Sequence, residues 1–225
     1  VFSIYRGYLY RSFSGGFDWQ IADSGKSQIY FGSKNRVFSL GASGIYRSSD
    51  LGSTWQLING NLPASYIEKK SAIVEVDGVL YAGFNGTRAR MHLPPVWEQG
   101  GIYRSFDGGE SWQPFHTGLP YEGNVPAPVY GITVKDKMIL LRTIKGYFVL
   151  KAGSWTSLES AIPAESYIRD ITYFNDYIYV LAYKGCFKID PVTFQMDSVN
   201  TGLTWVNGYN YYSVFLTYKD SLFIY

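Results

Sequence analysis

The sequence predicts an all-β protein assembled from copies of one four-stranded antiparallel unit. Three observations predict this fold class: a long phrase that occurs twice, a regular spacing of aromatic landmarks, and a composition rich in strand-forming residues. A fixed internal repeat is the sequence signature of a fold built by stacking one supersecondary unit. The 21 Tyr, 14 Phe and 6 Trp agree with it, because half-buried pleated surfaces favour aromatic side chains.

The two copies of the phrase match without a gap. One copy begins at Gly44 and reads Gly-Ile-Tyr-Arg-Ser-Ser-Asp-Leu-Gly-Ser-Thr-Trp-Gln. The other begins at Gly101 and reads Gly-Ile-Tyr-Arg-Ser-Phe-Asp-Gly-Gly-Glu-Ser-Trp-Gln. In both, Ile-Tyr-Arg-Ser alternates apolar and polar residues with the period of a half-buried strand. We therefore expect a strand, a turn and a second strand.

Four positions of each copy have a structural role in this turn. The Ser hydroxyl and the Asp carboxylate can accept hydrogen bonds from the turn's own N–H groups. The Gly supplies a backbone angle that a Cβ would disfavour. The Trp opens the next strand and can fold its ring back over the turn. These residues are Ser48, Asp50, Gly52 and Trp55 in one copy, and Ser105, Asp107, Gly109 and Trp112 in the other.

Weaker copies of the phrase occur in phase with the two full ones. A degenerate copy spans Tyr10–Trp19 and has Ser14 where the Asp belongs, and two echoes end at Trp155 and Phe194. The aromatic landmarks Trp19, Trp55, Trp112, Trp155 and Phe194 are separated by 36, 57, 43 and 39 residues. A propeller blade of four short strands takes roughly 40–50 residues. The longest interval contains an insertion, Asn85 to Gly100.

Further alternating runs supply the first two strands of each unit. They are 27–31 and 36–40, 72–76 and 79–83, 130–134 and 138–142, 168–174 and 177–182, and 213–218 and 221–225, while 1–5 is a second strand without a first. We expect one β-propeller domain over 1–225, with blade segments at about 1–23, 24–63, 64–120, 121–163, 164–203 and 204–225. Because both ends stop inside a blade, we expect a segment of a ring of about six to eight blades, or a five-bladed ring if it closes as given.

The phrase resembles the Asp-box (BNR-type) hairpin, Ser-x-Asp-x-Gly-x-Thr-Trp, of sialidase-type and sortilin-type β-propellers. The copy at Asp50 matches in full, and the copy at Asp107 has Ser111 in place of Thr. The resemblance implies that the box lies in the turn between the third and fourth strands, away from the usual binding mouth, so that its Asp is structural. The Leu-Pro ending and the following Asp-Gly-Val-Leu-Tyr-Ala-Gly run look like secreted repeat proteins of Bacteroidetes-type bacteria. That likeness implies export, an extracellular or cell-surface location, and a place in a cell-surface or outer-membrane complex.

Charge and composition argue against nucleic-acid binding, a membrane span and a metal site. The net charge is +2 with no basic run, which disfavours nucleic-acid binding. No apolar run is long enough for a membrane span. The single cysteine, Cys186, is expected to be a small buried hydrophobe. Only two histidines are present, and no Cys/His spacing suggests a metal site. We expect no metal and no cofactor.

Candidate ligand-binding residues lie on the insertion and on the links between blades, which open on the side opposite the repeat turns. Exposed aromatics beside charges suit sugar rings or a protein partner. Packing between blades is the alternative role for them, and the insertion could be a Pro-stiffened segment that merely packs over its neighbours. The candidates are Arg88, Arg90, Trp97, Glu98, Tyr66, Tyr121, Glu122, Tyr167, Trp205 and Tyr209.

Two functions remain open. A non-catalytic binding or scaffolding propeller for a glycan or a protein partner is favoured, with no catalytic residue assigned. The alternative is a glycoside hydrolase of sialidase-like or xyloglucanase-like type, which would need two carboxylates across a cleft. Glu68, Glu98, Glu122 and Glu165 lie on the expected side, but their spacing selects no pair. The arginines at 11, 47 and 104 belong to the repeat itself.

Overall fold

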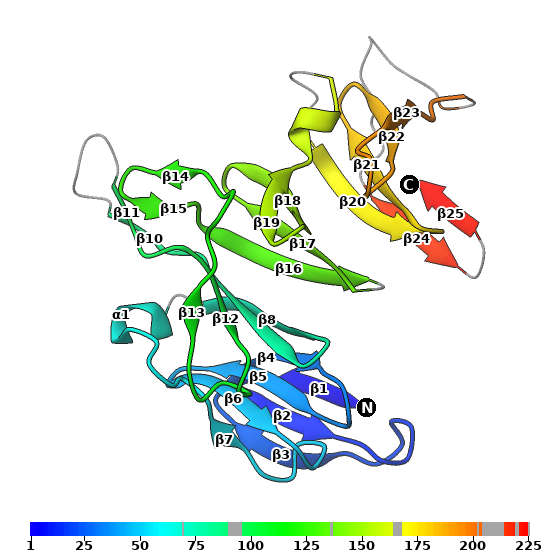
Figure 1. The fold of residues 1–225 in the computed structure, drawn as a ribbon. Coiled ribbons are helices and arrows are strands. Elements are labelled where there is room, and N and C mark those ends of the chain that lie inside the picture. The colour runs from blue at the N-terminus through cyan, green and yellow to red at the C-terminus, as the bar shows by residue number, and fades with distance from the viewer. Residues whose placement is uncertain are drawn as a thin grey trace. The chain divides into compact units, whose positions relative to one another are not determined.

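The computed structural model describes residues 1–68, 70–89, 96–135, 137–163, 168–201, 203, 214–218 and 221–224 (Figure 1). The predicted fold class is confirmed, because the described elements are almost all strands and pair into antiparallel sheets, four of which have four strands each. By compactness the chain divides into two units, 1–145 with 153–155, and 146–152 with 156–225. Each unit is described by itself.

The first three sheets belong to the first unit. The first sheet has three strands in the order β1-β2-β3, and the next two have four, in the orders β4-β5-β6-β7 and β8-β9-β12-β13. The strands are β1 (Phe2–Tyr5), β2 (Tyr8–Arg11), β3 (Gln20–Ser24), β4 (Lys26–Phe31), β5 (Val37–Gly41), β6 (Gly44–Ser48), β7 (Gln56–Leu57), β8 (Lys70–Val76), β9 (Val79–Phe84), β12 (Gly101–Ser105) and β13 (Gln113–Pro114).

In the remaining sheets, neighbouring strands are consecutive along the chain. These sheets are β16-β17-β18-β19, β20-β21-β22-β23 and the hairpin β24-β25. The strands are β16 (Val129–Lys135), β17 (Met138–Thr143), β18 (Gly146–Lys151), β19 (Ser154–Ser157), β20 (Ile168–Phe174), β21 (Tyr177–Ala182), β22 (Gly185–Ile189), β23 (Met196–Ser198), β24 (Phe215–Tyr218) and β25 (Ser221–Ile224). The blade boundaries at 23, 63, 120, 163 and 203 stay a prediction.

Short elements fill the links. They are helix α1 (Ala64–Ile67), the hairpin β10 (Thr87–Ala89) with β11 (Val96–Glu98), the hairpin β14 (Tyr121–Glu122) with β15 (Val125–Pro126), and the 3₁₀ turn η1 (Glu159–Ala161). The two flanks of the insertion 85–100 form short strands that the sequence analysis does not predict. Thr87 pairs with Glu98 and Ala89 with Val96, so these flanks form a ribbon of their own.

Tight turns with positive φ join the first and second strands of several sheets. The two central residues are Lys34 and Asn35 (φ 53° and 62°) in the second sheet, and Asn175 and Asp176 (φ 45° and 65°) in the β20–β21 turn. Two-residue turns with positive φ match the right-handed twist of antiparallel strands. These turns therefore fix the registers of the inner hairpins, which the alternating pattern alone leaves free.

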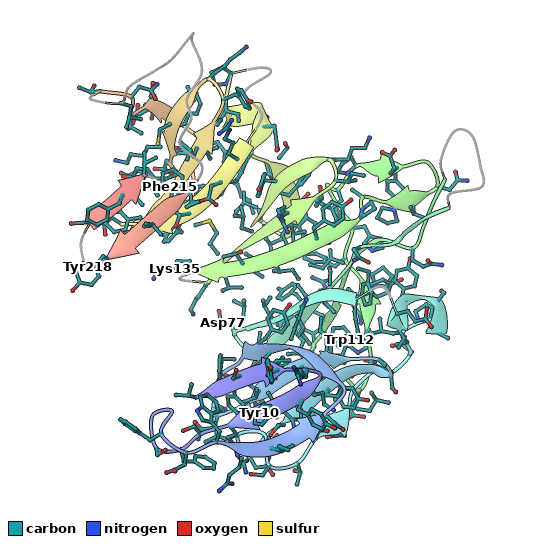
Figure 2. The ribbon with its side chains drawn as sticks, turned by 180° about the vertical axis from the view of Figure 1, so that it is seen from behind. Tyr10, Asp77, Trp112, Lys135, Phe215 and Tyr218 are labelled. Atoms are coloured by element: carbon teal, nitrogen blue, oxygen red, sulfur yellow. The ribbon has the colours of Figure 1, made fainter. Side chains whose placement is uncertain are left out.

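The core lies between neighbouring sheets. Strand β5 is buried at all five positions, because its sheet is covered on both faces. Between the second and third sheets, Phe38, Ile45, Ile73 and Phe84 are fully buried, together with the Trp112 ring (Figure 2). Cys186 is 1% exposed, which confirms the prediction of a buried thiol, and burial raises its pKa to about 11.

Candidate binding face

Each four-stranded sheet has two ends with different roles. One end carries the turn between its first and second strands and the turn between its third and fourth strands, which we name the turn end. The other, which we name the link end, carries the second-to-third connection and the link to the next sheet. In an antiparallel sheet these connections must alternate between the two ends. The repeat turns therefore lie at the turn end, whereas the links that carry Tyr66, Tyr121 and Glu122 lie at the link end.

The repeat turns hold themselves together through Ser and Asp. The Asp50 Oδ1 atom accepts hydrogen bonds from the Thr54 N–H at 2.8 Å and the Ser48 hydroxyl at 2.7 Å, and Oδ2 accepts from the Thr54 hydroxyl at 2.7 Å. The Gly52 N–H donates to the Ser48 hydroxyl at 2.7 Å. The Trp55 ring lies over the turn, 3.5 Å from where a Cβ on Gly52 would stand.

The second copy repeats these bonds at the same offsets. The Ser105 hydroxyl donates to Asp107 at 2.7 Å, the Ser111 N–H donates to Asp107 at 2.9 Å, and the Gly109 N–H donates to Ser105 at 2.8 Å. In the first copy, the hydrogen bonds that Asp50 accepts, above all the one from the Thr54 N–H, lower the pKa of Asp50 to about 2. The Ser111 hydroxyl is the first cause that holds the pKa of Asp107 far below its usual range. Both carboxylates stay ionised and engaged, so neither can act as an acid or base near neutral pH.

The degenerate first copy keeps part of this geometry. The Ser14 hydroxyl accepts from the Asp18 N–H at 2.8 Å, which is the bond that Asp50 makes with Thr54. The Ser12 hydroxyl accepts from the Gly16 N–H at 2.8 Å. A hydroxyl thus takes the place of the carboxylate.

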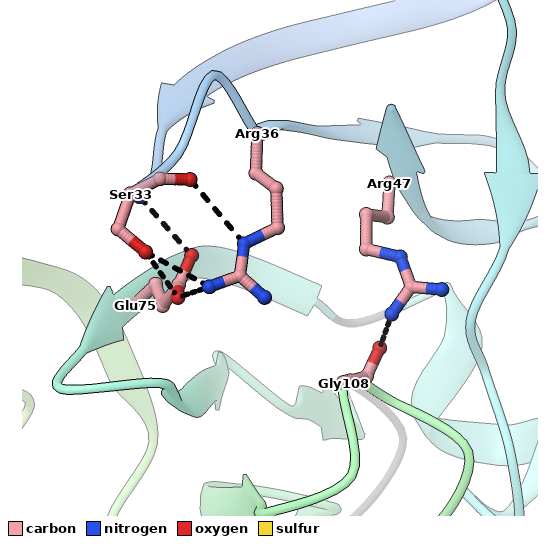
Figure 3. A network of polar contacts seen from close by, with 5 residues as sticks. All are labelled: Ser33, Arg36, Arg47, Glu75 and Gly108. Carbon is pink, nitrogen blue, oxygen red and sulfur yellow. Dashed lines mark hydrogen bonds and ion pairs between the residues drawn. The ribbon is translucent and has the colours of Figure 1, made fainter. Parts of the chain in front are cut away.

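Two arginines of the repeat, Arg11 and Arg47, each donate hydrogen bonds to the next sheet. Arg47 donates through Nη1 to the Gly108 carbonyl at 2.7 Å, as Figure 3 shows. Arg11 makes the equivalent bond to the Leu51 carbonyl at 3.2 Å and a second to the Ser53 hydroxyl at 2.6 Å. Sequence reasoning assigned these arginines to the repeat without this role. The sequence signal for this role is the position that the arginines share, three residues before the Asp of the repeat or before Ser14, which replaces it.

Tryptophans make a second contact between sheets. The Trp112 indole N–H donates to the Ile58 carbonyl at 2.8 Å, and the Trp155 indole N–H donates to the Phe115 carbonyl at 2.9 Å. Each acceptor lies three residues beyond the preceding tryptophan, since 55 + 3 = 58 and 112 + 3 = 115. The Trp55 indole N–H is buried and has no partner among the described residues.

A polar side chain closes the link end of three sheets. Asn59 accepts from the Ile45 N–H at 2.9 Å, Glu159 from the Tyr147 N–H at 2.8 Å, and Asn200 from the Cys186 N–H at 2.7 Å. Each donor follows a glycine, at 44, 146 and 185, where a Cβ would stand 2.0 to 2.9 Å from the side chain that accepts. We name this contact the link-end bond. Its glycine opens each repeat, but sequence reasoning gave that glycine no role.

The candidate ligand-binding residues fall into three groups in the structure. Tyr66, Tyr121 and Glu122 are described in full. For Arg88, Trp97 and Glu98 the backbone is described, and it places Arg88 opposite Trp97 in the β10–β11 ribbon. The others lie outside the described residues: Arg90, Tyr167, Trp205 and Tyr209.

Tyr66 lies in a cluster of rings at the link end of the third sheet. Its ring centroid is 5.2 Å from that of Phe84 and 5.3 Å from that of Tyr103, both in edge-to-face contact. Tyr66 is half-buried, so most of its ring serves packing. Burial, aided by Tyr66, raises the pKa of Tyr103 to about 12.

Tyr121 and Glu122 lie on the β14–β15 hairpin and are accessible. Tyr121 is 57% exposed. The Glu122 carboxylate forms an ion pair with Lys145, from the connection between β17 and β18, and the two side chains stay 30% and 43% exposed. The Gly101 N–H donates to the Ala127 carbonyl at 3.2 Å, which joins the end of the insertion to the end of this hairpin. The structure thus brings Tyr121 and Glu122 beside the insertion.

The described residues offer neither a metal site nor a membrane-spanning helix. No three His, Cys, Asp or Glu side chains in the described ranges are placed to hold a metal ion. Over the same ranges, no helix has the length and apolar character that a membrane crossing requires.

Four-stranded antiparallel sheets that follow one another along the chain define a β-propeller. Guanidinium or indole bonds join the first four sheets in succession. The comparisons agree on this class. Among solved structures, the chain is similar to an ancestral GH74 enzyme, with a TM-score of 0.57 and 14% identity over 93% of this chain and 30% of that one. It is also similar to the extracellular domain of a hybrid two-component system of B. thetaiotaomicron, with a TM-score of 0.56 and 13% identity over 85% and 25%.

A third similar structure is the GH74 xyloglucanase from Xanthomonas campestris, with a TM-score of 0.50 and 17% identity over 85% of this chain and 28% of that one. At these identities the likeness shows the fold alone. No protein-family model matches the chain. Among curated proteins it matches an F-box protein of Arabidopsis thaliana at 30% identity over 113 residues, which are 50% of this chain and 31% of that protein. The chain spans less than a third of the length of each of these proteins.

Proposed function

We propose that this chain is part of an exported, non-catalytic binding propeller. It recognises a glycan or a protein partner at the link end of its third and fourth sheets. The observation that carries the proposal is Tyr121, an exposed ring beside the Glu122–Lys145 ion pair and the end of the insertion. A flat apolar ring with charged groups at its edge suits both kinds of ligand.

The accessibility of the ion pair supports this role. Glu122 and Lys145 hold each other in place, yet both remain partly exposed. A ligand can therefore accept from the ammonium and donate to the carboxylate without first separating two buried charges. Trp97 and Arg88 lie opposite each other on the neighbouring β10–β11 ribbon and would extend the surface.

The repeat turns support a scaffold role for the other end of each sheet. We take them to be Asp-boxes, since Ser48, Asp50, Gly52 and Trp55 make the turn-closing contacts that the resemblance implies. Their carboxylates are occupied by their own turns, which leaves ligand binding to the link end. An extracellular or cell-surface location, in a cell-surface or outer-membrane complex, fits the extracellular domain to which the chain is similar.

Glycoside hydrolysis is the second candidate, because two of the similar structures are GH74 enzymes, one of them a xyloglucanase. It would need two carboxylates facing each other about 5–10 Å apart. Glu122 is engaged with Lys145, and Glu68 lies just beyond α1. The remaining candidates are Glu98 and Glu165.

The proposal is tested by binding to an array of glycans, followed by titration calorimetry with each hit. Tyr121→Ala should weaken binding about tenfold, the cost of one lost aromatic contact of about 1.4 kcal/mol. Tyr5→Ala is the matched control, because Tyr5 is 59% exposed but lies on the first sheet, away from this face. Both variants should melt at the wild-type temperature.

Two outcomes would change the assignment. If Tyr121→Ala and Tyr5→Ala bind every hit as tightly as the wild type, the link end of these sheets is not the site. If the protein releases reducing sugar from xyloglucan and Glu122→Gln or Glu98→Gln abolishes the release, the chain is a hydrolase.

Trp97→Ala should weaken binding without lowering the melting temperature; a large loss of stability would make the insertion a packing element.

A further inference from the structure

The third sheet departs from the link-end bond at His116. In three other sheets an Asn or Glu side chain occupies this place, at 59, 159 and 200, and accepts from a backbone N–H. His116 corresponds to Asn59, since 112 + 4 = 116 and 55 + 4 = 59. Its Nε2 atom is shielded from solvent and has no hydrogen-bond partner among the described residues.

The imidazole is wedged between two backbone segments. Its Nε2 atom lies 2.7 Å from where a Cβ on Gly101 would stand, and the Pro126 Cβ lies 2.9 Å from the same point. Gly101 begins β12 directly after the insertion, and Pro126 ends β15. The Gly101 N–H···O Ala127 bond that joins these segments is therefore adjacent to the ring. We name this place the β12–β15 junction.

The groups around the ring favour its neutral form. The Tyr103 ring contacts His116 edge-on, with centroids 5.6 Å apart and an interplanar angle of 83°, and Tyr66 lies one ring further. Phe84 and Pro126 add apolar surface. Tyr103 is the ring that contacts His116 directly, Tyr66 and Phe84 pack on Tyr103, and the titratable side chains among these three are phenols. No described carboxylate pairs with His116. Burial lowers the His116 pKa below 6.5, and a hydrogen bond to the Ile102 backbone offsets part of that effect.

We infer that His116 is an acid-sensitive switch at the β12–β15 junction. When Nε2 takes up a proton it becomes a donor without an acceptor and a charge without a counter-ion, in a place walled by rings. The imidazolium must turn toward water, which separates Gly101 from Pro126 and breaks the Gly101–Ala127 bond. The junction is closed above the ordinary histidine pKa of 6.5 and opens as the pH falls through the lower value of the folded protein.

The consequence for binding rests on the proposed function. The hairpin that carries Tyr121 and Glu122 ends at this junction, so acid would release a ligand held there. The switch itself does not depend on a ligand. It is therefore measured at the junction, and a failure of ligand binding would leave that measurement unaffected.

The test is an NMR titration of the 225-residue chain between pH 7.5 and pH 4.5, combined with exchange of the Gly101 amide, which is the donor of the junction bond. His116 should titrate below 6.5, with a transition in the chemical shift of the Gly101 amide at the same midpoint. Over this range the protection factor of the Gly101 amide should fall, tenfold for each unit by which the His116 pKa is lowered. Protection factors already correct for the intrinsic pH dependence of exchange.

Two variants make the test specific. His116→Asn places at this position the residue found at 59 and 200, and should keep the junction protected at every pH. His92→Gln removes the chain's other histidine and should leave the wild-type response unchanged. Equal loss of protection in wild type and His116→Asn would overturn the inference. So would a wild-type His116 that titrates at or above 6.5, a result that needs no folded variant.

Discussion

Replacing Glu75 with Ala should release the turn between β4 and β5 from the neighbouring third sheet. The Glu75 carboxylate is 1% exposed and accepts from the Ser33 N–H at 3.2 Å, from the Ser33 hydroxyl at 2.8 Å and from the Arg36 guanidinium (Figure 3). Ser33 and Arg36 lie in the turn, and Glu75 lies on β8. One buried carboxylate thus closes the turn and connects it to the next sheet.

The magnitude follows from what the substitution leaves behind. Removing one partner of a fully buried ion pair costs about 3–5 kcal/mol, because the other charge stays buried. The Arg36 side chain is 25% exposed and can recover part of its hydration, so we expect Glu75→Ala to cost about 2–3 kcal/mol. Glu75→Gln keeps an acceptor for Ser33 and loses only the charge, so it should cost about 1–2 kcal/mol.

Urea unfolding of the two variants measures both values, with unchanged m-values as the sign that the unfolding transition is otherwise the same. Asp77→Asn is the matched control. Asp77 forms an ion pair with Lys137 at 3.0 Å, only two residues from Glu75, but the two side chains are 62% and 74% exposed. The control should lie within about 0.5 kcal/mol of the wild type. Equal effects of Glu75→Ala and Asp77→Asn would refute the reasoning that burial sets the cost.

Two further predictions concern the tryptophans and the repeat turns. Trp112→Phe should lower the free energy of unfolding by about 1–2 kcal/mol more than Trp55→Phe. The reason is that Trp112 donates its indole N–H to the Ile58 carbonyl, whereas the Trp55 indole N–H has no described partner. Thermal denaturation of both variants measures the difference, and equal losses would contradict the role of that bond. The stabilisation from the Asp50 turn should be complete above pH 3.8 and disappear as the pH falls through about 2, and Thr54→Val should raise the Asp50 pKa in an NMR titration of the carboxyl carbon. An Asp50 carboxyl that titrates near 3.8 in the wild type would show that the turn does not hold it.

Most strands could be predicted because their signals are local. The runs 168–174 and 177–182 match β20 and β21 residue for residue, since alternation and the Asn175–Asp176 turn define both ends. The runs 72–76 and 79–83 fall short of β8 and β9 by two residues and one residue at their link ends. The signal weakens there, because β-bulges follow Lys70 in β8 and Lys26 in β4, and a bulge changes no composition.

The contacts between sheets could not be predicted, because they depend on residues far apart in sequence. Nothing near Arg47 indicates the Gly108 carbonyl, which lies 61 residues away. The flanks of the insertion were missed for a related reason: Thr87–Ala89 and Val96–Glu98 are short, and neither alternates clearly. Among the candidate site residues, sequence reasoning could select Tyr121 by type. It could not place Lys145 beside Glu122, because that pairing depends on how two links approach each other.

The indole and guanidinium bonds between sheets have a consequence for how such a chain can grow. In each bond the donor belongs to one sheet and the acceptor to its neighbour. The two indole acceptors, Ile58 and Phe115, each lie three residues after the tryptophan of their own repeat. A duplicated segment of the gene would therefore encode both the donor for one neighbour and the acceptor for the other. The new sheet would join the array through contacts that already exist, and stability would increase by nearest-neighbour terms, as in other repeat proteins. Length can then vary between descendants without a new interface having to evolve.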